Sequence, residues 1–183
     1  FDRRKYIAFT SLKRSKEMFF QGLADRGIHM HVMVGNHDSY YKNTLELNSI
    51  DLLLEEYDNI STYVQPEVVE FDGTKIMFVP WICDANSEQT FVMADKTDAQ
   101  ILLGHLELSG YEMNKSIVID HGISDAWLKK FDLVCSGHYH HKSQNGSINY
   151  LGTAYELTWS DYADQKGFHI LDTDTRTIEF IPN

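Results

Sequence analysis

Three short segments of the chain place a glycine directly before side chains that can bind a metal. They are Gly35-Asn36-His37-Asp38, Gly104-His105 and Gly137-His138-Tyr139-His140. Each follows an apolar run, and in the first run apolar residues alternate with others, which is the period of a half-buried strand. Open α/β sheets place ligand sites at the carboxyl ends of their strands. The pattern therefore predicts one site at which three strand ends meet.

The types and spacing of these side chains favour a metal centre. His138 and His140 are two residues apart, so an extended segment directs both rings to one side. Imidazole nitrogen together with carboxylate and amide oxygen suits manganese, iron or zinc better than calcium. Taken alone, the first segment is equally compatible with a turn, because Asn, Gly and Asp are common turn residues. The three clusters together, each after a strand, favour the metal site.

The order of these clusters resembles the later motifs of calcineurin-like metallophosphoesterases. Within that superfamily, the chain is more similar to the SbcD-type DNA nuclease subunits, and among these to the type encoded by T-even bacteriophages. The segments that carry the resemblance are Val34–Asp38, Val79-Pro80-Trp81, Gly104–Leu108, Ser136-Gly137-His138, Tyr150–Thr153 and Glu179–Asn183. They extend over nearly the whole chain.

The resemblance implies two divalent metal ions, with Mn²⁺ expected and Mg²⁺ as the alternative. Asn36, His105 and His138 would bind the second ion, and His140 would bind the first. An amide oxygen adds no charge, so Asn36 would keep the site cationic enough to attract a phosphodiester. Two ions about 3.5–4 Å apart can clamp the attacking and leaving oxygens of a phosphoryl transfer.

The same resemblance gives His37 a role other than metal binding. His37 would face the substrate and protonate the leaving oxygen or stabilise the transition state, a role worth about 10²–10⁴-fold in rate. Asp2 would pair with His37 and hold the imidazole in one tautomer. The alternative for Asp2 is a solvent-facing carboxylate at the start of the chain.

The chain departs from the family at its start. Family members begin with Asp-x-His and Gly-Asp-x-x-Asp motifs, and only Phe1-Asp2-Arg3-Arg4 resembles the tail of the second motif here. We therefore expect residues 1–183 to be a metallophosphoesterase (nuclease) domain that lacks its N-terminal metal motifs and strands. It would also lack any C-terminal capping or ATPase-binding region. Such a fragment is expected to be inactive alone.

The hydrophobic pattern predicts alternating helices and strands followed by a β-rich C-terminal third. Helices are expected over 4–26, 48–57, 86–95 and 124–130, and strands over 28–34, 60–64, 67–71, 75–79, 100–103, 132–136, 147–151, 167–172 and 176–181. The first helix would bury one stripe, formed by Ala8, Leu12, Phe19 and Leu23. Asp72-Gly73 and Asn145-Gly146 are strong turn signals. This order fits an α/β fold, a metallophosphoesterase-like αββα sandwich of two mixed β-sheets flanked by helices.

Composition limits the possible partners. The net charge of −11 argues against DNA binding by the surface of this chain alone, because such binding normally uses clustered Lys and Arg. Metal ions or a basic partner would offset this charge.

No apolar run reaches membrane-spanning length. Cys135, inside an apolar run, is expected to be a buried free thiol, which fits a cytoplasmic protein, in the host cytoplasm if phage-encoded.

Three functions remain as alternatives. The leading one is a metal-dependent DNA nuclease, with exonuclease and endonuclease activity in recombination, repair and replication, that works with an SMC-like ATPase subunit. The second is another calcineurin-like phosphoesterase, a protein phosphatase or a cyclic-nucleotide phosphodiesterase. The third is a non-catalytic scaffold of the same fold. The Gly-His-x-Glu-x-x-Gly and Val-Pro-Trp segments favour the nuclease.

A homodimer is expected as well. By the resemblance, helices 4–26 and 48–57 would pair two subunits, with Tyr6, Phe9, Phe20 or Ile50 as exposed apolar contacts. The alternative is that these four side chains pack into the core of their own domain.

The tryptophans are expected to be core or sheet-face residues rather than platforms for base stacking; they are Trp81, Trp127 and Trp159.

Overall fold

A six-stranded mixed sheet is the largest element of the computed structural model, which describes residues 5–114 and 117–183. In spatial order its strands are β3 (Glu67–Phe71), β4 (Thr74–Val79), β5 (Ile101–Gly104), β8 (Leu133–Ser136), β10 (Ile148–Tyr150) and β9 (Ser143–Asn145). The four central strands run parallel, and the outer strands β3 and β9 are antiparallel to their neighbours. The register aligns the last residues of the parallel strands at one edge, where Val79 pairs with Gly104, and Gly104 with Ser136.

Both predicted turns close the outer hairpins of this sheet. Asp72 and Gly73 have φ angles of 48° and 85°, the left-handed conformation that a two-residue hairpin turn of type I′ requires. The turn between β9 and β10 contains Gly146 with φ 58°. Local turn chemistry therefore sets the register of both sheet edges.

A second layer of strands packs on one face of the six-stranded sheet. It consists of a parallel pair, β1 (Met30–Met33) with β2 (Ile60–Tyr63), and an antiparallel pair, β11 (Gly167–Asp172) with β12 (Thr177–Pro182). Side chains from both layers form one apolar cluster that includes Tyr63, Phe78, Ile101, Leu133 and Cys135. The prediction of two mixed sheets is thus met only in part, because within the described residues the second layer is two separate pairs. A further small hairpin, β6 (Glu112–Asn114) with β7 (Ile117–Val118), was not predicted.

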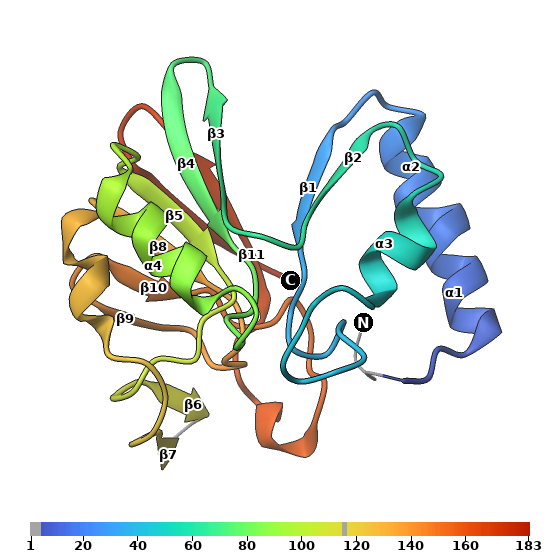
Figure 1. Cartoon of the computed structure of the whole chain (residues 1–183). Coiled ribbons are helices and arrows are strands. Elements are labelled where there is room, and N and C mark those ends of the chain that lie inside the picture. Colours follow the sequence, from blue (N-terminus) through green and yellow to red (C-terminus); the bar gives the residue numbers. More distant parts are fainter. Residues whose placement is uncertain (1–4, 115–116) are drawn as a thin grey trace.

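Helices cover the outer face of the six-stranded sheet and the outer side of the β1–β2 pair (Figure 1). Helix α4 (Ser87–Lys96) and the 3-10 helix at Asp125–Lys130 contribute Ala94 and Leu128 to the cluster on the far face of the six-stranded sheet. Helices α1 (Phe9–Ser15), α2 (Gln21–Ala24) and α3 (Ser49–Leu54) lie beside β1 and β2. The α/β class is confirmed, and the layers follow the order helix, strand, strand, helix.

The first helix differs from its prediction at both its start and its buried face. Residues 5–8 are not helical, so the helix begins at Phe9 and not at residue 4, and residues 1–4 lie outside the described part. Five residues between α1 and α2, Lys16–Phe20, form a π-helical turn. A π-turn rotates the following residues relative to an α-helix. Phe20 is consequently the buried ring, while Phe19, expected on the buried stripe, is 51% exposed.

The prediction for Cys135 is confirmed, and α3 begins at a local capping residue. Asn48 caps α3, since its side chain accepts a hydrogen bond from the backbone N–H of Asp51 at 2.8 Å. Cys135 is a buried free thiol, and burial raises its pKa to about 12. Among the described residues, none of the helices has the length and apolar character needed to cross a membrane.

Candidate metal centre

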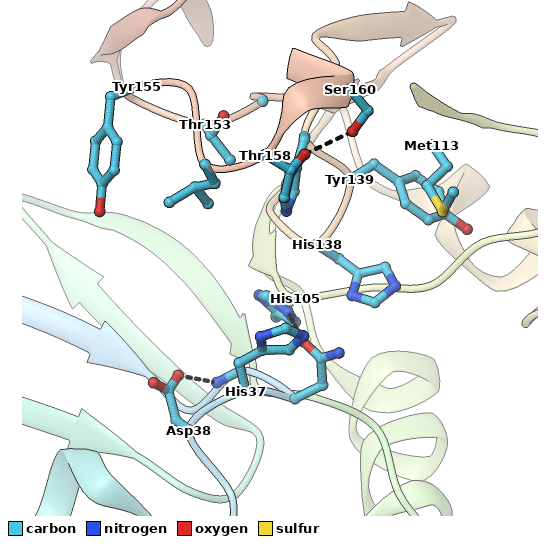
Figure 2. Close-up of a pocket in the computed structure, with 15 residues that line it drawn as sticks. His37, Asp38, His105, Met113, His138, Tyr139, Thr153, Tyr155, Thr158 and Ser160 are labelled. Atoms are coloured by element: carbon cyan, nitrogen blue, oxygen red, sulfur yellow. Dashed lines mark hydrogen bonds between the residues drawn. The ribbon is translucent and has the colours of Figure 1, made fainter. Parts of the chain in front are cut away.

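The three glycine-led segments meet at one edge of the strand layers, as predicted. They follow β1, β5 and β8, and together with the loop 152–160 they line a cavity of about 550 Å³. Figure 2 shows His37, His105 and His138 on one side of this cavity and Thr153, Tyr155 and Thr158 on the other. The parallel register explains the meeting point, because it brings the ends of β5 and β8 side by side.

Asn36 and His105 approach each other most closely. The Oδ1 atom of Asn36 lies 2.9 Å from Nε2 of His105, although the two residues are 69 positions apart. Gly35 makes this approach possible, since a Cβ atom there would lie only 2.9 Å from Cε1 of His105 and 3.1 Å from Oδ2 of Asp38. Asp38 accepts a hydrogen bond from the backbone N–H of Gly35 at 2.8 Å, which holds the turn.

His138 lies next to this pair in a strained backbone conformation. Its φ angle is 83°, and a residue other than glycine in this region costs on the order of 1–3 kcal/mol. Its ring centroid lies 5.3 Å from that of His105 and 5.1 Å from that of Trp81. With this backbone conformation, the ring of His138 lies beside the rings of His105 and Trp81, which follow β5 and β4.

Both buried imidazoles are held neutral. Burial lowers the pKa of His105 to about 3, and the neighbouring His138 and His37 add to the effect. Burial also lowers the pKa of His138 to about 4, with His37 and His140 as further causes. A neutral imidazole keeps a lone pair for a metal ion. Two such rings beside an amide oxygen fit a divalent transition-metal ion.

His140 lies on the other wall of the cavity. Its Nδ1 atom is 3.2 Å from both carboxylate oxygens of Asp161, a side chain that is 2% exposed. Burial raises the pKa of the Asp161 carboxyl, but hydrogen bonds from Thr158 and His140 outweigh burial and hold the pKa well below its ordinary value. Asp161 was not predicted as a site residue. A local signal existed, because Thr158-x-x-Asp161 forms a capping box.

Five of the six predicted site residues line this cavity: Asn36, His37, His105, His138 and His140. The sixth, Asp2, lies outside the described residues. In the described part of the chain, no group of three or more His, Cys, Asp or Glu side chains is arranged to hold a metal ion. Asp38 is the one carboxylate among the described lining residues. Besides hydroxyl groups, the described lining therefore offers four imidazoles, one amide and one carboxylate as donors.

Two further side chains approach the site from outside the cavity. Glu107 lies 3.9 Å from Nε2 of His138 and 3.3 Å from Nε2 of His121. His121 is largely exposed and is not among the residues that line the cavity. The prediction for Trp159 was wrong, because this side chain is 92% exposed, on the loop that forms the cavity wall.

The comparison with known proteins supports the class predicted from the motifs. Over 105 residues the chain is 28% identical to the SbcD subunit of the nuclease SbcCD of Staphylococcus epidermidis, a match that covers 52% of this chain and 28% of that protein. No family model matches the chain. The resemblance to SbcD-type nuclease subunits is thus confirmed at the level of sequence similarity.

A phage protein is more similar to the chain than the staphylococcal subunit is. The chain is 38% identical over 183 residues to exonuclease subunit 1 of Enterobacteria phage T4, a match that covers 100% of this chain and 53% of that protein. The predicted resemblance to a T-even phage subunit is therefore confirmed. The chain spans about half the length of this relative.

Proposed function

We propose that this chain is the nuclease domain of a metal-dependent DNA nuclease of the calcineurin-like metallophosphoesterase type. The observation that carries the proposal is the convergence of four predicted ligands, Asn36, His105, His138 and His140, on one cavity. Similarity to two proteins named as an exonuclease subunit and a nuclease subunit points to DNA as the substrate. Exonuclease and endonuclease activity in recombination, repair and replication would follow.

Two divalent ions, Mn²⁺ or Mg²⁺, are the proposed cofactors. Asn36, His105 and His138 would hold one ion and His140 the other. When bound, such ions act as Lewis acids on the phosphodiester and bring an attacking water within reach. The neutral imidazoles and the amide oxygen leave the site without excess negative charge, which favours the approach of an anionic phosphodiester.

His37 is the proposed general acid. It lines the cavity beside Asn36 and is close enough to His105 and His138 to lower the pKa of both. From this place its ring would donate a proton to the leaving oxygen, because an alcohol leaves more easily than an alkoxide. Pairing of His37 with Asp2 remains a prediction.

The charge of the chain makes a partner part of the proposal. A net charge of −11 does not attract DNA. One relative is named as a subunit of SbcCD. We therefore propose that this chain works in a complex with an SMC-like ATPase subunit that supplies a basic surface, in the cytoplasm, which is that of the host if the chain is phage-encoded.

A homodimer is also proposed, with a reduced set of contacts. Tyr6 and Phe9 are 77% and 87% exposed. Phe20 and Ile50 are 7% and 5% exposed, so the prediction that they help form an exposed patch was wrong. They belong to a buried cluster with Leu54 of α3 and Val32 of β1. Light scattering should report a dimer that Tyr6→Glu with Phe9→Glu converts to a monomer. A monomeric wild type at tens of micromolar would reject the dimer.

The alternatives make different predictions for the full-length protein. A nuclease degrades labelled linear duplex DNA with Mn²⁺ and stops when a chelator is added. A phosphatase or cyclic-nucleotide phosphodiesterase on the same fold leaves the DNA intact but hydrolyses a phosphoprotein or a cyclic nucleotide. A scaffold does neither. His138→Ala should abolish DNA degradation and His121→Ala should retain it.

A further inference from the structure

The loop 157–166 carries a buried carboxylate that the proposed chemistry does not use. Asp161 ends a short 3-10 helix, Trp159–Asp161, and its side chain is 2% exposed. This carboxylate is fully occupied by hydrogen bonds, as a buried charge must be. Its partners come from both the loop itself and the cavity wall, which suggests two separate tasks for its two oxygens.

The oxygen Oδ2 holds the loop. It accepts hydrogen bonds from the backbone N–H of Leu157 at 3.0 Å, the backbone N–H of Thr158 at 2.7 Å and the hydroxyl of Thr158 at 2.9 Å. These three donors saturate Oδ2, although it also lies 3.2 Å from Nδ1 of His140. The loop is thereby tied to the carboxylate whatever the state of His140.

The oxygen Oδ1 faces the histidine. It lies 3.2 Å from Nδ1 of His140 and 3.4 Å from Nζ of Lys166, and neither loop backbone donor reaches it. Lys166 is buried as well, and its Nζ also donates to the carbonyl oxygen of His140 at 2.7 Å. The charged pair of Asp161 and Lys166 therefore holds His140 twice: Asp161 bonds the ring, and Lys166 bonds the backbone carbonyl.

This geometry determines which nitrogen of His140 is free. A carboxylate can only accept, so Nδ1 must carry the proton that joins the two groups. The lone pair of the neutral ring then lies on Nε2. A histidine that binds a metal typically donates its other N–H to a carboxylate, which fixes the ring and the tautomer.

We propose that Asp161 is a positioning residue that holds His140 with its proton on Nδ1 and its Nε2 lone pair available to a metal ion. The metal part of this proposal rests on the proposed function, whereas the tautomer part does not. Asp161 itself would touch neither metal nor substrate, because it stands behind His140.

The substitution Asp161→Asn tests the proposal sharply. An asparagine has one acceptor oxygen, and the three donors at the Oδ2 position would retain it. The amide NH₂ then replaces Oδ1 and offers a donor to Nδ1 of His140. His140 must respond by moving its proton to Nε2, which removes the lone pair proposed for the metal, while the loop keeps its hydrogen bonds.

The chain offers a matched control in the next pair along the loop. Asp164 accepts from Nδ1 of His141 at 3.1 Å and from Nζ of Lys166 at 2.9 Å. His141 is not among the residues that line the cavity. Asp164→Asn therefore perturbs the same lysine and a similar histidine pair but leaves the carboxylate beside the His140 ring in place.

The measurements use the full-length protein, with every variant at the same mildly alkaline pH. Nitrogen-15 spectra of the metal-free protein should show His140 with its proton on Nδ1 in the wild type and in Asp164→Asn, and on Nε2 in Asp161→Asn. In calorimetric titration with Mn²⁺, Asp161→Asn should bind about 10–100-fold more weakly at one position. Asp164→Asn should bind as the wild type does.

Each outcome decides one part of the proposal. An unchanged His140 tautomer in Asp161→Asn overturns the proposal. An equal loss of Mn²⁺ affinity in Asp161→Asn and Asp164→Asn also overturns it, because the loop would then only stabilise the structure in general. The expected tautomer change with no Mn²⁺ binding by the wild type would retain the positioning role and reject the metal centre. If Asp161→Asn fails to fold, the tautomer of His140 in the wild type decides alone, and a proton on Nε2 overturns the proposal.

Discussion

Acid should destabilise the metal-free protein well above the pH at which its carboxylates titrate. His105 and His138 have native pKa values lowered to about 3 and about 4. In the unfolded chain both take the ordinary value of about 6.5. Below pH 6.5 the unfolded state therefore binds more protons than the native state, and the free energy of unfolding falls as the pH falls.

The size of the effect follows from the two shifts. Each pH unit below the unfolded pKa costs about 1.4 kcal/mol per group until the native pKa is reached. At pH 5 this amounts to about 2 kcal/mol for each histidine, or about 4 kcal/mol for the pair. That loss is a large part of a typical total stability of about 5–15 kcal/mol. Both side chains are well buried, so solvent screening reduces the figure only modestly.

Urea titrations followed by tryptophan fluorescence at pH 7, 6 and 5, with a chelator present, measure the effect. The wild type and His121→Gln, a control at a largely exposed histidine, should lose the same free energy on acidification. His105→Gln with His138→Gln should lose much less, whatever its stability at pH 7. A wild-type loss below about 1 kcal/mol, or an equal slope in the double variant, would refute the assignment of buried neutral histidines.

Three further substitutions test the site and its support. His37→Ala should retain metal and DNA binding but lose about 10²–10⁴-fold in cleavage rate, and near-normal cleavage would remove His37 from the mechanism. Gly35→Ala places a methyl group 2.9 Å from His105, so it should cost about 1–3 kcal/mol in urea titrations, whereas Gly22→Ala in the first helical run should not destabilise. Tyr150→Phe deletes a hydroxyl that bonds two buried backbone groups; unfolding should become about 1–3 kcal/mol easier, and an unchanged midpoint would contradict this.

Local signals predicted much of the fold. The hairpin at Asp72-Gly73 was predictable because only a few residue types accept two consecutive positive φ angles. The strand ends at Gly35, Gly104 and Gly137 were predictable for a related reason, since a glycine after an apolar run marks where a chain must turn. Where sequence and geometry are linked by a few neighbouring residues, the prediction holds.

Predictions failed where the outcome depends on distant parts of the chain. The π-turn after α1 changed which phenylalanine is buried, and no local pattern indicates where an α-helix takes an extra residue. The pair of His140 with Asp161 spans 21 positions, so only the capping box on one side of it was visible in the sequence. The exposure of Trp159 likewise follows from the path of its loop and not from its residue type.

The most direct test of the proposed metal centre is anomalous diffraction from crystals of the full-length protein grown with Mn²⁺. We expect a manganese peak in the cavity at about 2 Å from Oδ1 of Asn36 and Nε2 of His105, with the ring of His138 as a further ligand. A second peak should lie beside Nε2 of His140. Manganese-dependent cleavage of DNA by a protein whose cavity shows no anomalous peak would rule out this cavity as the metal centre.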